Sequence, residues 1–336
     1  MGRMKNYSIW VTTDCNLRCT YCYEGQNKKQ TYIDRNVADK IIDFIVDQEK
    51  SDTEELSIDF HGGEPFLNFR ILEYFVDNLN SRLNKKIYYG LTTNAIIMNE
   101  DIIKFLEEKI DDITVSLDGT SKTHNTTRCF LNGDGSYDIA MNNSLKILKI
   151  SNNLRVRMTI TAKMVQSLSE DVLHLLNKGF KCIVPIVDLF GKDWTDEKLD
   201  VLKDEIEKIK NIELPKDCCV SLLEPIHINC IHQCYGGINE ASIYSDGKIY
   251  PCIMTAGKKE FEIGDIYHGI DINKRNALLQ HNKEQYYECV NCDLQNGCDG
   301  KRCKMINKII TGSFIVPPAL TCELQHITYL ENGLDV

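Results

Sequence analysis

The 336-residue sequence has no run of about 18 apolar residues, so it contains no candidate membrane span. Its first ten residues include basic side chains but no apolar segment, which excludes a secretory signal peptide. Internal repeats and low-complexity tracts are absent as well. Basic residues are outnumbered, because 39 Lys and Arg stand against 49 Asp and Glu, for a net charge of −10. Since an acidic surface repels phosphate groups, we expect neither nucleic acid nor a membrane as a partner.

Cysteine is the residue that the sequence has in excess. Fifteen cysteines occur in a chain with no export signal. A reducing cytosol keeps thiols from forming disulfides, so clustered cysteines there indicate metal ligands or catalytic groups. The remaining composition, 43% hydrophobic and 26% charged, is ordinary for a globular protein and excludes disordered, collagen-like and coiled-coil classes. The sequence therefore predicts a cytoplasmic protein, of about two domains by length, whose cysteines bind metal.

Strand and helix patterns alternate through the first two thirds of the chain. Apolar, β-branched runs predict strands at 9–13, 56–60, 87–93, 113–117, 156–161 and 182–187. Helical periodicity lies between and after them, at 33–49, 69–83, 102–108, 139–150, 168–176 and 197–209. Six such units predict a parallel sheet, either open and doubly wound or curled into a partial barrel. In both cases a ligand site belongs at the carboxyl ends of the strands.

The alternation stops after about residue 212. Residues 213–229 read as a bridge, and 241–252 as a hairpin that turns at Ser245-Asp246-Gly247. Residues 289–303 are rich in Gly, Asp, Asn and Cys and have little apolar periodicity. Such a segment needs an internal anchor, which a metal cluster supplies. We therefore predict two domains, 1–212 and 213–336.

Three cysteines, Cys15, Cys19 and Cys22, follow the first predicted strand and are called here the first cysteine loop. A closed structural zinc site uses four ligands, and a ferredoxin sequence uses two-residue gaps with a fourth cysteine nearby, so neither fits well. The alternative to a metal site is that the three cysteines are simply buried or free thiols. Three thiolates on a four-iron cluster leave one iron without a protein ligand. An open metal position is typical of a reactive site.

Polar motifs end the next three predicted strands. They are Gly62-Gly63-Glu64-Pro65, Thr92-Thr93-Asn94 and Ser116-Leu117-Asp118-Gly119, the last followed by His124 and Arg128. Each motif alone usually marks only a turn. Together with the first cysteine loop, however, they place four loops at the carboxyl ends of the strands. Two glycines allow close backbone approach, and Glu64 offers a charge partner for an ammonium group.

The loop Cys15-Asn16-Leu17-Arg18-Cys19-Thr20-Tyr21-Cys22-Tyr23 resembles that of the radical S-adenosylmethionine (SAM) superfamily. The later motifs resemble its GGEP, TNG and SxDG…H-D…R elements, with Ala95 in place of a glycine and Asn125 in place of an acid. The resemblance implies a [4Fe–4S] cluster whose open iron is chelated by SAM, and reductive cleavage of SAM to methionine and a 5′-deoxyadenosyl radical. The cofactor-binding residues that it implies are Tyr21, Gly62, Gly63, Glu64, Thr92, Asn94, Ser116, Asp118 and Arg128.

A second cysteine zone contains Cys234-x12-Gly247-x4-Cys252, then Cys289-x2-Cys292-x5-Cys298-x4-Cys303, and finally Cys322. It resembles the SPASM extension, with one extra residue before Cys303. The resemblance implies two auxiliary [4Fe–4S] clusters, one bound by Cys234, Cys252 and Cys303 and the other by Cys289, Cys292, Cys298 and Cys322. Cys230 is the candidate fourth ligand of the first of these, and a substrate thiol is the alternative. A zinc ribbon remains a further alternative.

Taken together, the resemblance implies a partial (β/α)6 barrel, open on one side, followed by a small SPASM domain. It implies hydrogen abstraction from a peptide, with a thioether or other crosslink in a ribosomally made, cysteine-containing peptide as the expected product. Formylglycine formation on a sulfatase is the alternative, but sulfatase maturases carry an Asp where this chain has Ile253. A non-catalytic iron–sulfur electron carrier or a zinc protein is an alternative of another class. No catalytic side chain is assigned.

We further expect a reductant such as flavodoxin or ferredoxin as a partner, and an anaerobic or low-oxygen cytoplasm, because cluster iron is sensitive to oxygen. The first strand is predicted to begin by residue 9. That leaves no room for an N-terminal leader-binding domain, so we expect recognition of a leader peptide to come from elsewhere or to be dispensable.

Overall fold

The computed structural model describes residues 5–25, 29–49, 55–151, 153–224, 226–227, 234–284, 286–295, 298, 300 and 303–335. Within these residues, no helix combines the length and the apolar character that crossing a bilayer requires.

The strands of the first two thirds of the chain form one parallel array. In sheet order these are β1 (Lys5–Trp10), β2 (Leu56–His61), β3 (Ile87–Thr93), β4 (Asp112–Ser116), β5 (Arg155–Ile160), β6 (Cys182–Val187) and β7 (Cys219–Val220). The six predicted strands are confirmed, with β3 and β6 at the predicted bounds. The first strand starts and ends earlier than predicted, and the two-residue β7 was not predicted because it is too short to carry a pattern.

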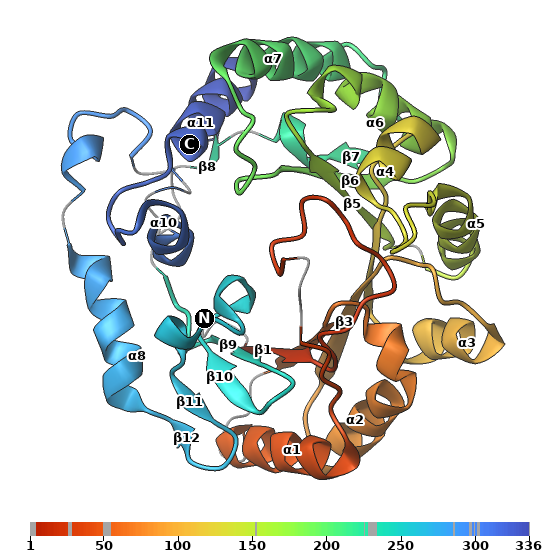
Figure 1. Cartoon of the computed structure of the whole chain (residues 1–336), viewed down its shortest axis with the longest axis vertical. Helices are drawn as coiled ribbons and strands as arrows, with labels where there is room; N and C mark the ends of the chain where they lie inside the picture. Colours follow the sequence, from red (N-terminus) through yellow and green to blue (C-terminus); the bar gives the residue numbers. More distant parts are fainter. Residues whose placement is uncertain are drawn as a thin grey trace.

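Six amphipathic helices cover this array: α1 (Arg35–Glu49), α2 (Phe69–Arg82), α3 (Glu100–Lys109), α5 (Tyr137–Leu148), α6 (Leu168–Asn177) and α7 (Asp196–Lys210). They form an arc on the outside of the curved sheet (Figure 1). In α1, for example, Ile41, Ile42 and Ile45 are fully buried against the strands. Because the helices lie on one face, the sheet is a partial (β/α)6 barrel and not a doubly wound sheet.

The short helix α4 (Ser121–Thr127) lies between β4 and α5 and was not predicted. Its sequence is entirely polar, so it has no apolar periodicity. The Thr120 side chain caps its first turn by accepting a hydrogen bond from the Thr123 amide. Single-turn 3-10 helices occur at Pro65–Asn68 (η1), Val165–Ser167 (η2), Ser221–Leu223 (η3), Ile253–Thr255 (η4), Lys259–Phe261 (η5), Gln280–Lys283 (η6) and Tyr287–Cys289 (η7).

The last third of the chain continues the same sheet. The predicted hairpin is confirmed as β9 (Glu240–Ile243) and β10 (Lys248–Tyr250), and β11 (Gly264–Asp265) and β12 (Gly269–Ile270) extend it. Strand β9 runs parallel to β1, so that the sheet crosses the predicted domain boundary at residue 212. The remaining elements are β8 (Ile226–His227), β13 (Leu334–Asp335), α8 (Ile272–Leu279), α10 (Lys304–Thr311) and α11 (Ala319–Asn332).

A small second core joins the cysteine-rich part to the barrel. Trp10 of β1 is fully buried and donates a 3.0 Å hydrogen bond from Nε1 to Ser242 Oγ of β9. Tyr250, Phe261 and Met305 share this core, and two cysteines of the second zone pack against it. Burial of these large side chains fixes the cysteine-rich part beside the first strand.

Candidate active site

The carboxyl ends of the parallel strands surround a cavity of about 320 Å³. The chain that follows β1 lies inside the ring of strands (Figure 1) and forms part of the cavity wall. The C-terminal third contributes Ile253, Met254 and Ile306 to the same wall. The cavity therefore lies where a parallel α/β sheet binds its ligands, and it is closed partly by the cysteine-rich part.

All three cysteines of the first cysteine loop line this cavity. Hydrogen-bond donors face two of the sulfurs: the Leu17 amide lies 3.4 Å from Cys15 Sγ and Asn94 Nδ2 lies 3.7 Å from it. Arg128 Nη1 lies 3.8 Å from Cys19 Sγ. Burial raises the pKa of the Cys19 thiol to about 11. These donors favour the negative thiolate that metal binding requires, so the loop fits a cluster of which one iron is open.

A single metal ion fits the described residues poorly. Among them, no three His, Cys, Asp or Glu side chains lie close enough together to bind one ion. A four-iron cluster distributes its ligands over several metal atoms, so sulfurs placed around one cavity satisfy a cluster without meeting at a point.

The two glycines after β2 are required by a close backbone approach. The Gly63 amide donates to Thr12 O at 3.0 Å and the Glu64 amide donates to Asp14 O at 2.8 Å. A Cβ on Gly63 would stand 2.2 Å from Asp14 O, and one on Gly62 would stand 2.5 Å from Thr12 O. Any side chain here would therefore push away the segment that leads into the first cysteine loop.

Glu64 faces the cavity with its carboxylate held in one orientation. It is 1% exposed and accepts hydrogen bonds from Thr93 Oγ1 at 2.8 Å, the Asn94 amide at 2.8 Å and the Phe66 amide at 3.2 Å. Burial raises its pKa to about 7, although these donors and Arg128 act in the opposite direction. No ion pair from the described residues reaches it. A cation bound in the cavity, such as an ammonium group, would lower the pKa of Glu64 and keep its carboxylate ionised.

Asn94 joins the third strand to the first cysteine loop. Its Nδ2 donates to Asn16 Oδ1 at 2.7 Å, and its Oδ1 accepts from the Ile96 amide at 3.0 Å. The next residue, Ala95, has φ 58°, a left-handed conformation that glycine adopts most easily. Ala95 is fully buried and its carbonyl accepts from Asn143 Nδ2 at 2.8 Å. Tertiary contacts therefore hold Ala95 in a left-handed backbone geometry that a glycine would adopt more easily.

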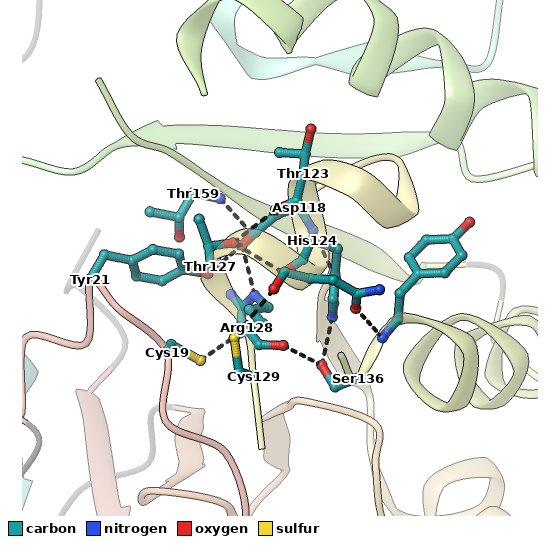
Figure 2. A network of polar contacts seen from close by, with 12 residues as sticks. Cys19, Tyr21, Asp118, Thr123, His124, Thr127, Arg128, Cys129, Ser136 and Thr159 are labelled. Carbon is teal, nitrogen blue, oxygen red and sulfur yellow. Dashed lines mark hydrogen bonds and ion pairs between the residues drawn. The ribbon is translucent and has the colours of Figure 1, made fainter. Parts of the chain in front are cut away.

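Asp118 is the centre of a buried polar network (Figure 2). It is fully buried, and its Oδ2 accepts from Tyr21 OH at 2.6 Å, Thr127 Oγ1 at 2.8 Å and Arg128 Nε at 3.0 Å. Its Oδ1 accepts from the Thr159 amide at 3.0 Å. Burial alone would raise its pKa, but Arg128 and the other donors lower it below its ordinary value. The ionised carboxylate thereby orients Arg128, which in turn donates to Cys19.

A second chain of hydrogen bonds supports Arg128 from α4. His124 Nδ1 accepts from the Asp118 amide at 3.3 Å, and His124 Nε2 lies 3.0 Å from Ser136 Oγ. Ser136 Oγ donates to the Arg128 carbonyl at 2.7 Å, so Nε2 carries the ring proton. Burial lowers the pKa of His124 to about 4, and the ring is neutral at pH 7. His124 and Ser136 are thus positioning residues.

The structure brings most of the predicted cofactor-binding residues to one place. Those that line the cavity are Tyr21, Gly62, Gly63, Glu64, Thr92, Asn94, Ser116 and Arg128. Asp118 does not line it and acts through Arg128 and Tyr21. Sequence reasoning missed other cavity residues, among them His61, Arg157, Thr159, Asp188 and Phe190. His61, Arg157 and Thr159 lie within strands, Asp188 and Phe190 follow one, and no motif marks any of them.

The cysteines of the second zone form two groups. Burial raises the pKa of Cys252 to about 12, with additions from Glu240 and from the thiols of Cys303 and Cys234. Burial raises the pKa of Cys322 to about 11, with additions from Cys298, Cys289 and Cys292. Such effects act over short distances, so each group is local. These are the two groups that the resemblance implies, while Cys230 lies outside the described residues.

Comparison with protein families gives a match to the Radical SAM superfamily over residues 9–162. Among curated proteins, an uncharacterised protein of Methanocaldococcus jannaschii is 33% identical over 182 residues, which is 54% of this chain and 61% of that protein. A cysteine-type anaerobic sulfatase-maturating enzyme of Clostridium novyi is 26% identical and covers 88% of both chains. A radical SAM cyclopropyl synthase of Paramaledivibacter caminithermalis is 24% identical and covers 89% of this chain and 67% of its own.

Two groups of solved structures share the fold. Native anSMEcpe with bound AdoMet and Kp18Cys peptide superposes with a TM-score of 0.78 at 19% identity, over 97% of this chain and 96% of that chain. Streptococcus suis SuiB bound to precursor peptide SuiA has a TM-score of 0.68 at 18% identity, over 95% of this chain and 76% of that chain. At these identities the likeness establishes the fold.

Proposed function

We propose that this chain, a radical SAM enzyme related to sulfatase maturases and peptide-modifying enzymes, abstracts hydrogen from a peptide and forms a thioether or other crosslink in it. One observation carries the proposal: three cysteine sulfurs share a cavity with Glu64, Asn94 and Arg128, which follow three further strands. A non-catalytic electron carrier gives these side chains no common task.

The residues of the cavity fit a four-iron cluster and SAM. When bound, a reduced four-iron cluster and SAM supply a radical that removes hydrogen from an unactivated carbon. Cys15, Cys19 and Cys22 would hold the cluster, and Glu64 would pair with the SAM amino group. The protein positions the substrate carbon and excludes water and stray reductants. The cavity has an apolar wall, which includes Phe190 and Met254 and suits the exclusion of water.

Support for a peptide substrate comes from the fold and from the cavity. Both structural neighbours named above contain bound peptides. Ile253 and Ile306 of the cysteine-rich part line the cavity together with the first cysteine loop. We propose that the two cysteine groups of the second zone hold auxiliary clusters, supplied with electrons by flavodoxin or ferredoxin.

The proposed crosslink is favoured over formylglycine formation by one residue. Formylglycine formation needs a base, and the expected position after Cys252 is occupied by Ile253, whose side chain lines the cavity. An aliphatic side chain accepts no proton. A crosslink that proceeds through a cysteine sulfur can use an auxiliary iron to bind the thiolate, since metal binding itself lowers the thiol pKa.

The test is 5′-deoxyadenosine formation by anaerobically reconstituted protein with dithionite and SAM. We expect product from the wild type and none from Cys19→Ala. Cys218→Ala, which changes a half-buried cysteine outside both cysteine zones, is the matched control and keeps full activity. Absence of product from the wild type would support the electron-carrier class instead.

A second variant separates the two cysteine zones. Cys292→Ala keeps SAM cleavage but loses modification of the peptide, because its sulfur belongs to the group around Cys322 and not to the cavity. Retained peptide modification by this variant would contradict the proposed auxiliary cluster.

A further inference from the structure

A buried lysine lies among the cysteines of the second zone. Lys304 is 2% exposed and is the first residue of α10, directly after Cys303. Burial of an ammonium group costs free energy unless negative charge surrounds it. The position of Lys304 in the helix adds to that cost, because the N-terminus of a helix carries partial positive charge. The surroundings of Lys304 therefore have to supply negative charge.

The aromatic ring of Tyr286 fixes the position of this ammonium group. Lys304 Nζ lies 4.8 Å from the centre of the Tyr286 ring, which is a cation–π contact. Tyr286 is 5% exposed, and its hydroxyl donates to Phe314 O at 3.2 Å. Asn307, one turn further along α10, donates to the same carbonyl at 3.3 Å and to Gly300 O at 2.8 Å. These contacts hold Tyr286 and the start of α10 together in the interior.

Tyr286 lies close to both cysteine groups of the second zone. The Cys289 amide donates to Tyr286 O at 3.1 Å, so the ring stands at the start of the segment that carries the group around Cys322. Burial raises the pKa of Tyr286 well above its ordinary value, and the thiols of Cys289, Cys303 and Cys234 add to that rise. Cys303 and Cys234 belong to the other group. Since such effects act over short distances, the ring and the ammonium group above it lie near both groups.

A fixed positive charge at this place bears on the redox chemistry of bound clusters. Thiolate-ligated iron–sulfur clusters are negative, and their reduction potentials depend on nearby charge and on burial. A cation near two such clusters favours the addition of an electron to either of them. Because Lys304 is buried, salt in the solvent screens its charge little.

We propose that Lys304 raises the reduction potential of the auxiliary clusters by placing a positive charge close to both cysteine groups. The inference rests on the proposed function, because it takes these groups to be cluster ligands. Joining a thiol sulfur to a carbon breaks one S–H and one C–H bond. The hydrogen atom from carbon goes to the 5′-deoxyadenosyl radical, the proton from sulfur goes to solvent, and one electron is left over. An auxiliary cluster of higher potential accepts this electron more readily.

The test is a redox titration of the anaerobically reconstituted chain, followed by electron paramagnetic resonance. All proteins carry Cys15→Ala, Cys19→Ala and Cys22→Ala, so that only clusters of the second zone contribute. We expect Lys304→Met to lower the equilibrium constant for cluster reduction about tenfold, which is a fall of about 59 mV in midpoint potential for one electron. Lys304→Arg keeps the charge, so we expect a change below about threefold.

Lys308→Met is the matched control. Lys308 lies one turn later on the same helix, and its Nζ is 5.5 Å from the centre of the Phe314 ring. Its ammonium group, however, donates to Gly312 O at 2.7 Å at an exposed position. Because solvent screens this charge, we expect the potential to stay unchanged. If Lys304→Met does not retain its iron, Lys304→Gln, which keeps a polar side chain without the charge, replaces it.

The outcomes distinguish the inference from the function on which it rests. Equal potentials with and without Lys304→Met, at equal iron content, overturn the role of Lys304 and leave the auxiliary clusters in place. A fall in Lys304→Arg as large as that in Lys304→Met also overturns it, because the charge is then not the cause. Protein that binds no iron in the second zone overturns the auxiliary clusters of the proposed function, and the role of Lys304 with them.

Discussion

Asp118 offers the sharpest test of how the protein positions its site. In Asp118→Asn the shape is kept, but an amide nitrogen replaces Oδ2 or Oδ1 and the negative charge is lost. Oδ2 accepts from Tyr21, Thr127 and Arg128, and Oδ1 accepts from the Thr159 amide. The substitution therefore leaves the buried Arg128 without its counterion. The new amide N–H group also faces a hydrogen-bond donor from which the carboxylate oxygen had accepted.

The magnitude follows from the burial of the pair. The side chains of Arg128 and Asp118 are 8% and 0% exposed. Removing one partner of such a pair costs about 3–5 kcal/mol, because the remaining charge stays buried and uncompensated. Replacing both partners with apolar groups, as in Asp118→Leu with Arg128→Met, costs less than Asp118→Asn alone if the unpaired charge is the main penalty.

The assay is urea unfolding of reconstituted protein under anaerobic conditions, with the free energy taken by linear extrapolation. Arg155→Met, which removes an exposed ion pair, is the control and loses less than about 1 kcal/mol. A loss below about 1 kcal/mol for Asp118→Asn would refute the account of Asp118 as the buried counterion that orients Arg128.

Two further variants test the site. Because burial lowers the pKa of His124 from 6.5 to about 4, the unfolded chain binds a proton there more readily, so stability is full above pH 6.5 and falls by about 3 kcal/mol as the pH drops to 4. His124→Gln flattens that part of the stability curve in pH-dependent urea unfolding, and an unchanged slope would contradict a buried neutral ring. Gly63→Ala lowers 5′-deoxyadenosine formation at least tenfold, because its Cβ would displace Asp14 and with it the first cysteine loop. Gly312→Ala is the control for backbone strain away from the cavity, because its added Cβ meets no atom and only the φ of +79° opposes the side chain. We expect it to keep the activity, and full activity in Gly63→Ala would show that the close approach is not needed.

Local patterns were sufficient to predict the barrel. The six βα units carry their own apolar periodicity, so β3 and β6 were predicted to the residue. Helix α4 was missed because it is stabilised by tertiary contacts: His124 and Thr127 are buried in the Asp118 network, and no apolar stripe announces them. The pairing of β9 with β1 also lacks a local signal, because the tertiary context and not the sequence of a strand decides which strand lies parallel to it.

The parts of the candidate site that require particular residue types at fixed positions were predictable from the sequence. Gly63 and Glu64 are recognisable because close approach and a buried carboxylate each demand one residue type. Asp118 was recognised as part of a motif, but its contacts come from residues as distant as Tyr21 and Thr159, so its role as an orienting group required the fold. Arg157 is an ordinary strand residue in sequence, and only the structure shows that its guanidinium faces the cavity with no partner among the described residues.

The central claim is that Cys15, Cys19 and Cys22 leave one iron open for SAM. Electron paramagnetic resonance of dithionite-reduced, reconstituted protein tests it directly, with and without SAM. The account predicts that SAM shifts the signal of the wild type, and that Cys19→Ala shows no such shift. A wild-type spectrum that SAM leaves unchanged would contradict it.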